Sequence, residues 1–208
     1  MTIPTLDEAS YHRALGELAD RDRDLDHVLS NHGPPPMWDR EPGFPTLVHI
    51  ILEQQVSLAS ARACFDKLLN TVERLTPESL LALDDEALKK AGFSRQKIEY
   101  ARILAEGVQT GGLDLVGLVD LPDNKAREQL MRLKGIGRWT ADIYLLMALG
   151  RPDVWPVGDL ALVVAAQRIK GLEARPNLEE FRDLGEAWRP WRSVAARLLW
   201  HHYLEAGK

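Results

Sequence analysis

The chain has 208 residues, of which 45% are hydrophobic and 27% charged, a composition typical of a folded globular protein. Its single cysteine excludes an internal disulfide and any iron–sulfur cluster or zinc site held by several cysteines. The net charge of -5 argues against nucleic acid as a partner, because phosphate contacts normally make such proteins basic, although the local distribution of charge matters more than the sum.

The N-terminal segment carries acidic residues where a signal peptide would be apolar. No run approaches the ~20 apolar residues that a membrane span needs. We therefore expect a protein without a membrane partner, located in the bacterial cytosol.

Helical periodicity dominates the chain. Apolar residues recur at helical spacing between 98 and 108 and between 191 and 199, and sustained alternation of period two is missing. Residues 31–45 contain five prolines and two glycines, which predicts a long loop. Thr76 and Pro77 predict a helix start with proline at the first position. The pattern predicts an all-α protein, and only residues 113–121 leave this assignment open.

The stretch LKGIGRWTA (133–141) separates helices predicted over roughly 122–132 and 138–149. Gly135 and Gly137 can adopt positive φ, and the first amides of the second helix form a seat for a phosphate. An ordinary glycine-capped connection fits the same pattern. Residues 124–138 hold one anion, Glu128, against five cations: Lys125, Arg127, Arg132, Lys134 and Arg138. Both interpretations of the turn stay open at this point.

These motifs together resemble the helix-hairpin-helix superfamily of DNA glycosylases, and in particular its 3-methyladenine DNA glycosylase II branch. The resemblance rests on LKGIGRWTA, on the spacing from it to Asp159, and on three further stretches: IILEQQVSLASA (50–61), GFSRQKIEYARILAE (92–106) and WRPWRSVAARLLWHHY (188–203).

The resemblance implies two helical lobes with a central cleft. One lobe would be continuous, over 34–145, and would end in the helix-hairpin-helix, whereas the other would combine 1–33 with 146–208. The N-terminal sheet domain of the larger members of the branch is not expected in this chain.

Asp159 matches the catalytic aspartate of the family, whose carboxylate stabilises the oxocarbenium-like sugar that forms as the base leaves. It also precedes an apolar helix, where Asp is favoured as an N-cap, and both roles are compatible. Some relatives carry a lysine nucleophile directly after the hairpin arginine. Trp139 stands there, and an indole cannot form a Schiff base, so the resemblance implies a monofunctional enzyme without AP lyase activity.

The resemblance also implies an aromatic base pocket, because alkylated purines are cations that stack on indole rings. Trp139 and Trp200 match pocket tryptophans of the branch, and Trp38 is a third candidate in the proline-rich loop. On a helical wheel Trp200 lies opposite the apolar stripe of its helix. Trp139 lies in line with Ile143 and Leu146, so packing in the core remains an equal alternative.

Gln55, with Gln54 beside it, matches the wedge that fills the gap left by a flipped base, although both residues also fit as helix caps. A monovalent cation would be held by the backbone carbonyls of Met131, Leu133 and Ile136. No other cofactor is expected. The residues expected to bind DNA phosphates are Gly135, Gly137, Lys134, Arg138 and Thr140.

The sequence therefore predicts a monomeric glycosylase that acts on double-stranded DNA containing alkylated bases of the 3-methyladenine and 7-methylguanine type and leaves an abasic site. The alternative is a helix-hairpin-helix protein that binds damaged DNA without catalysis. A purely structural helical domain is a third possibility, and it would lack salt-dependent affinity for DNA.

Overall fold

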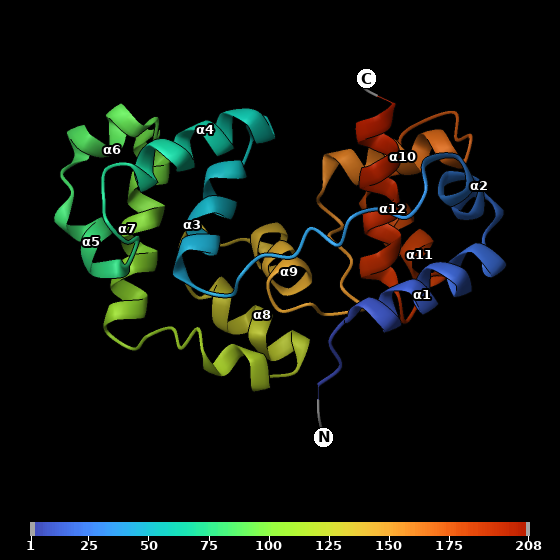
Figure 1. Cartoon of the computed structure of the whole chain (residues 1–208), viewed down its shortest axis with the longest axis horizontal. Coiled ribbons are helices and arrows are strands. Elements are labelled where there is room, and N and C mark those ends of the chain that lie inside the picture. The colour runs from blue at the N-terminus through green and yellow to red at the C-terminus, as the bar shows by residue number, and fades with distance from the viewer. Residues whose placement is uncertain (1–2, 207–208) are drawn as a thin grey trace. The chain divides into compact units, whose positions relative to one another are not determined.

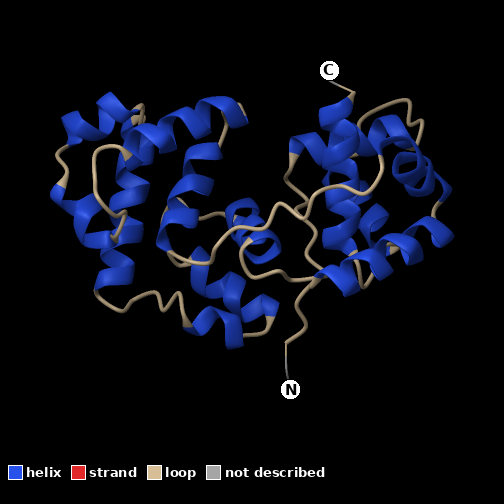
Figure 2. Ribbon diagram, viewed as in Figure 1, coloured by secondary structure: helices blue, strands red, loops and turns tan. Residues whose placement is uncertain are grey.

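The computed structural model describes residues 3–206, and every regular element in that range is a helix (Figures 1 and 2). The predicted all-α class is confirmed. In chain order the elements are α1 (Glu8–Arg21), α2 (Arg23–His32), α3 (Phe44–Glu53), α4 (Leu58–Leu69), α5 (Pro77–Ala82), α6 (Asp85–Ala91), α7 (Arg95–Gln109), the 3-10 helix η1 (Gly117–Asp120), α8 (Asp123–Met131), α9 (Arg138–Met147), α10 (Leu160–Ile169), α11 (Leu178–Glu186) and α12 (Arg192–Glu205).

Two local predictions are confirmed, and the segment left open is resolved. The proline-rich stretch is a loop over residues 33–43, shorter than predicted because 31–32 end α2 and 44–45 begin α3. Thr76 caps α5 by accepting from the Ser79 amide at 3.2 Å. Residues 113–121 form a turn and η1. The Asp114 carboxylate organises this turn, because it accepts from the amide of Gly117 at 3.0 Å.

The chain divides into two compact units. The first comprises Arg40–Tyr144 with Ile3, and the second comprises Pro4–Asp39 with the described residues from Leu145 onwards. Residues 34–39 therefore belong with the second unit rather than with the expected continuous lobe. Tyr11 Oη donates to the Pro35 carbonyl at 2.8 Å, which ties this stretch to α1. The outer limits expected for the lobes, residues 1 and 208, lie outside the described residues.

The core of the first unit is built around α3. This helix packs against α4 and α7, and α5 packs on the other side of α7. Residues 50–52 of α3 are almost completely buried, and Lys97 of α7 donates to the Leu52 carbonyl at 2.6 Å. The carboxyl end of α3 is thereby fixed against α7, immediately before the turn that carries Gln54 and Gln55.

The core of the second unit is built around α12, which packs against α10, α2 and α1. Every residue from Ser193 to Trp200 is buried, so this stretch has no exposed face, and Trp200 is buried as well as the apolar stripe on the opposite side of the helix. Arg197 has no exposed surface and donates to the carbonyls of Met37 (2.5 Å) and Leu146 (3.2 Å). Burial lowers the pKa of its guanidinium.

No helix among the described residues combines the length and the apolar character that crossing a membrane would require.

Candidate functional site

The hairpin consists of α8, a turn over residues 132–137, and α9. Only one of its two glycines has positive φ: Gly135, at 95°. A Cβ at Gly135 would lie 2.2 Å from Cγ of Tyr100, so the ring of α7 packs directly against this glycine. A Cβ at Gly137 would meet no atom within 4 Å. Gly135 is therefore required by the fold, whereas Gly137 keeps the surface of the turn open.

The first turn of α9 provides backbone donors for an anion. The Ala141 amide donates to the Gly137 carbonyl at 3.0 Å, which marks the first hydrogen bond of this helix. In any α-helix the first amides have no acceptor within the helix, and the helix dipole adds positive potential at the same end. This geometry suits a phosphate oxygen.

Thr140 does not offer its side chain to a phosphate as expected. It is 2% exposed, and its Oγ1 accepts a hydrogen bond from Gln54 Nε2 at 2.9 Å. Any contribution of Thr140 to phosphate binding is limited to its backbone amide.

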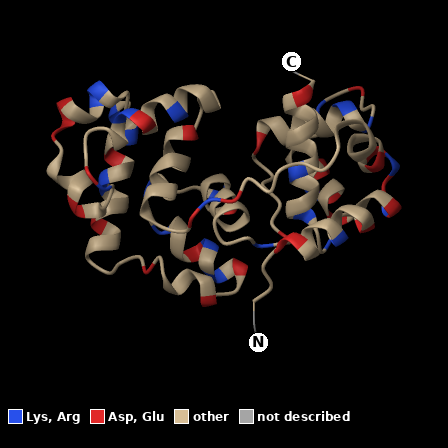
Figure 3. Ribbon diagram, in the orientation of Figure 1, with Lys and Arg blue, Asp and Glu red and all other residues tan. Residues whose placement is uncertain are grey.

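The cations of the hairpin are paired with acidic groups that the window 124–138 does not contain. Lys134 pairs with Glu99 of α7, and Arg138 Nε lies 3.4 Å from Asp142 Oδ2. Figure 3 shows acidic and basic residues interspersed along the helices of this unit. Lys134 and Glu99 are both largely exposed, and exposed ion pairs are weak, so a phosphate can displace Glu99 from Lys134. Arg138 is also exposed, but its partner Asp142 is buried.

Asp142 is a residue that the sequence analysis missed. Its side chain has no exposed surface, and Arg127 Nε donates to its Oδ1 at 2.5 Å. Burial raises the pKa of this carboxyl, and the charge of Arg127 opposes the rise. The spacing of four between Arg138 and Asp142 is the signal that would have revealed the pair. Asp142 thus forms ion pairs with both Arg127 of α8 and Arg138 of α9 and links the two helices of the hairpin.

The two glutamines at the end of α3 differ in their surroundings. Gln54 is half-buried and donates to the Gly135 carbonyl and to Thr140 Oγ1, each at 2.9 Å. Gln55 is exposed, with φ of 58°. Val56 beside it is 46% exposed. Gln55 thus presents its side chain outward, while Gln54 anchors the turn from within.

Asp159 lies in the second unit and is the N-cap of α10. Its Oδ1 accepts from the Leu162 amide at 3.0 Å and from the indole nitrogen of Trp200 at 3.2 Å. The side chain is almost buried, with 8% of the residue exposed. The capping role is therefore real, and the same oxygen touches one of the predicted pocket tryptophans.

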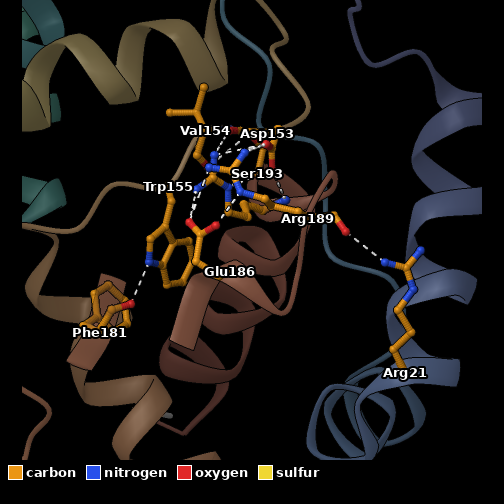
Figure 4. Close-up of polar contacts among 9 residues, drawn as sticks. Arg21, Asp153, Val154, Trp155, Phe181, Glu186, Arg189 and Ser193 are labelled. Atoms are coloured by element: carbon orange, nitrogen blue, oxygen red, sulfur yellow. Dashed lines mark hydrogen bonds and ion pairs between the residues drawn. The ribbon is translucent and has the colours of Figure 1, made fainter. Parts of the chain in front are cut away.

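The segment that leads into Asp159 is anchored to α11 and α12 (Figure 4). Asp153 pairs with Arg189 at 2.8 Å, and the Val154 amide donates to Ser193 Oγ at 2.9 Å. The buried Trp155 donates to the Phe181 carbonyl at 2.9 Å. Because these contacts lie four to six residues before Asp159, they fix the approach of the chain to the carboxylate.

Trp38 lies beside α12 in the same unit, half-buried, and its φ of 51° is strained for a bulky residue. Its ring centroid is 6.3 Å from that of His201, and His201 Nε2 donates to the His32 carbonyl at 3.1 Å. Trp38 therefore lies next to His201 of α12, the residue that follows Trp200 in the chain.

Trp139 belongs to the first unit, on α9, and it is half-buried. Ile143 is buried one turn later, and so is Tyr144. Trp139 is therefore only partly accessible, and its place in a base pocket stays a prediction beside the alternative of core packing.

The three carbonyls expected to hold a monovalent cation lie at the end of α8 and in the turn after it. The Leu133 carbonyl accepts from the Ile136 amide at 3.1 Å, which leaves a second lone pair on that oxygen. Backbone carbonyl oxygens are suitable ligands for a hard cation. The residues present therefore fit such an ion.

Comparison with known proteins identifies the class to which this fold and this hairpin belong. Residues 48–190 match the family model described as HhH-GPD superfamily base excision DNA repair protein. The chain belongs to this superfamily.

Relatives in the superfamily cover nearly the whole chain. DNA-3-methyladenine glycosylase 1 of Schizosaccharomyces pombe is 27% identical over 202 residues, which are 95% of this chain and 88% of the relative. The structure of the S. pombe 3-methyladenine DNA glycosylase in complex with abasic DNA aligns with a TM-score of 0.80 and 26% identity, covering 90% of this chain and 95% of that one. A DNA-3-methyladenine glycosidase from Bacillus halodurans aligns with a TM-score of 0.73 and 32% identity, covering 96% and 91%.

Proposed function

We propose that the protein is a monofunctional DNA glycosylase that removes alkylated bases, of the 3-methyladenine and 7-methylguanine type, and leaves an abasic site. The observation that carries this proposal is the Asp159 carboxylate, nearly buried and in contact with the indole of Trp200 at 3.2 Å. The names of the relatives support the substrate class, since they are 3-methyladenine glycosylases.

The reaction starts with extrusion of the damaged nucleotide from the base stack. The bond from C1′ to the base nitrogen then breaks, and its electron pair leaves with the base, which a methylated purine accepts readily because it is cationic. Positive charge develops on the sugar, where a carboxylate fixed before the reaction stabilises it. Water adds to C1′ and loses a proton to Asp159 or to solvent.

In the first unit, the first turn of α9 binds phosphate together with Lys134 and Arg138, and Gln55 is the wedge. The exposed side chain of Gln55 supports this role. A monovalent cation held by the carbonyls of the hairpin turn would strengthen the positive potential there. We place the reaction in the bacterial cytosol and expect the enzyme to act as a monomer.

The absence of a lysine directly after Arg138 supports hydrolysis without strand cleavage. The enzyme is expected to release free base from a methylated duplex and to leave the strand intact until alkali is added. Borohydride should trap no covalent complex with the DNA, because Trp139 cannot form a Schiff base. The measurement is a panel of duplexes with single defined lesions, read by mass spectrometry of the released base and by gel.

The same panel, combined with binding measurements, distinguishes the glycosylase from the two alternative hypotheses. Tight binding to damaged duplex with no base released would indicate a damage-binding protein instead. Affinity that does not depend on salt would indicate a domain that makes no phosphate contacts.

Replacement of Trp200 by Phe is expected to slow base release roughly ten- to a hundredfold, because a hydrogen bond to a charged group is worth about 1.5–3 kcal/mol. The rate should be measured in a single turnover. Trp188→Phe is the matched control, since Trp188 also donates its indole N–H to a carboxylate, that of Asp22 at 2.7 Å. It should lose stability but keep its rate, and equal rate losses in the two variants would contradict a specific role for Trp200.

A further inference from the structure

A single side chain in the first unit joins two turns that are distant in sequence. Gln54 follows α3, and its Nε2 donates to the Gly135 carbonyl in the hairpin turn and to Thr140 Oγ1 in α9, each at 2.9 Å. An amide nitrogen has two hydrogens, and this geometry occupies both. Thr140 is buried, so water cannot easily replace Gln54 as its partner.

The next residue is held in a conformation that side chains seldom adopt. Gln55 has φ of 58°, and left-handed backbone costs about 1 kcal/mol or more unless neighbouring contacts maintain it. Those contacts lie on both sides of it. Gln54 is tied to the hairpin, and Ser57 caps α4 by accepting from the Ser60 amide at 3.2 Å.

We propose that Gln54 is a positioning residue, which locks the turn that presents Gln55 to the hairpin that binds phosphate. This inference rests on the proposed function, in which Gln55 is the wedge. Gln54 itself is then not a second wedge, because both of its amide hydrogens point into the protein. Its role is to fix the distance and direction from the phosphate held at α9 to the side chain that enters the base stack.

If Gln54 fixes the position of Gln55 in this way, its loss should affect base flipping more than DNA binding. Loss of the Gln54 side chain leaves Lys134, Arg138 and the α9 amides in place, so the number of phosphate contacts is unchanged. The wedge, in contrast, is no longer fixed at the depth and direction that flipping requires. Binding to undamaged duplex should therefore be nearly normal, while flipping of a base is impaired.

The test uses a duplex with 2-aminopurine next to a stable abasic analogue, whose fluorescence rises when the base stack opens. Gln54→Ala should lower the extent of opening about tenfold, which corresponds to the loss of one to two hydrogen bonds. The salt dependence of its binding should equal that of the wild type. Thr140→Val should produce a smaller loss, and Thr140→Ser, which keeps the hydroxyl acceptor, should behave as wild type.

A second arm distinguishes positioning from general destabilisation. Gln54→Ala combined with Gln55→Ala should be no worse than Gln55→Ala alone, because Gln54 acts through Gln55. Ser79→Ala is the matched control in the same unit, since it removes polar contacts with the Thr76 amide and the Arg74 carbonyl far from the hairpin. It should lower stability and leave opening intact.

Additive losses in the double variant, or unchanged opening in Gln54→Ala, would overturn the inference, as would a wild type that does not open the duplex. The readout requires no bond cleavage. A wild type that opens the duplex in the expected pattern but releases no base would therefore contradict the glycosylase while the role of Gln54 stands.

Discussion

Asp159→Asn is expected to reduce the rate of base release by about two to three orders of magnitude, the usual cost of removing a group that stabilises charge in a transition state. The substitution removes the negative charge and keeps the size and shape of the side chain. Asn is as good an N-cap as Asp, and its oxygen can still accept from the Leu162 amide and from the Trp200 indole. The fold around α10 should persist, so that the lost rate reports on charge.

The measurement is single-turnover release of 3-methyladenine and 7-methylguanine from duplex DNA, with binding to abasic DNA and the unfolding temperature measured on the same preparations. Binding and unfolding should change little. A small decrease in stability is expected, because a charged cap interacts with the helix dipole by about 0.3–1 kcal/mol more than a neutral one.

Asp84→Asn provides the matched control. Asp84 is also an N-cap, and it accepts from the Ala87 amide at 2.7 Å at the start of α6, in the first unit. It should lose the same small amount of stability and keep the full rate. Wild-type rates in both variants would show that Asp159 is only a cap, and the proposed mechanism would fail.

The sequence was sufficient for features that depend on local chemistry. Helical spacing predicted α7 and α12, Pro77 predicted the start of α5, and the proline-rich stretch was correctly predicted to contain a loop, whose ends lie two residues inside the predicted bounds. The position of Asp159 at a helix N-terminus also followed from its neighbours. In each case the pattern is complete within a few residues.

The features that the sequence could not supply depend on contacts between distant segments. Glu99 pairs with Lys134 across 35 positions, and Gln54 reaches Thr140 across 86, so neither partner lies in a window that periodicity can scan. The all-round burial of α12 arises because α1, α2 and α10 surround it. The same holds for Trp38, whose backbone conformation depends on the loop around it rather than on its own preference.

Gly135→Ala is expected to have the largest effect on stability, because two costs add at this position. The backbone has φ of 95°, and the new Cβ would lie 2.2 Å from Cγ and 2.6 Å from Cβ of Tyr100, atoms at the root of that side chain that cannot move away without a shift of the backbone. Left-handed strain and overpacking each cost about 1–3 kcal/mol, so the free energy of unfolding should fall by roughly 2–6 kcal/mol. Urea denaturation measures the loss directly.

A substitution of Tyr100 allows the backbone strain and the steric conflict to be measured separately. In a Tyr100→Ala background the steric conflict is absent, and Gly135→Ala should then cost only the backbone strain, about 1–3 kcal/mol. An equal loss of stability in both backgrounds would mean that the ring does not constrain the hairpin.

Gly137→Ala tests the other half of the motif, the surface that phosphate approaches. A Cβ there would meet no protein atom within 4 Å, so the free energy of unfolding should change by less than about 1 kcal/mol. The methyl group would nevertheless stand at the entrance to the first amides of α9, and affinity for abasic duplex should fall about tenfold, as when one good contact is lost. A loss of stability in Gly135→Ala would show that Gly135 is needed for folding. A lower affinity in a stable Gly137→Ala protein would show that Gly137 is needed for DNA binding. Wild-type affinity in Gly137→Ala would instead mean that the phosphate does not enter at this end of α9.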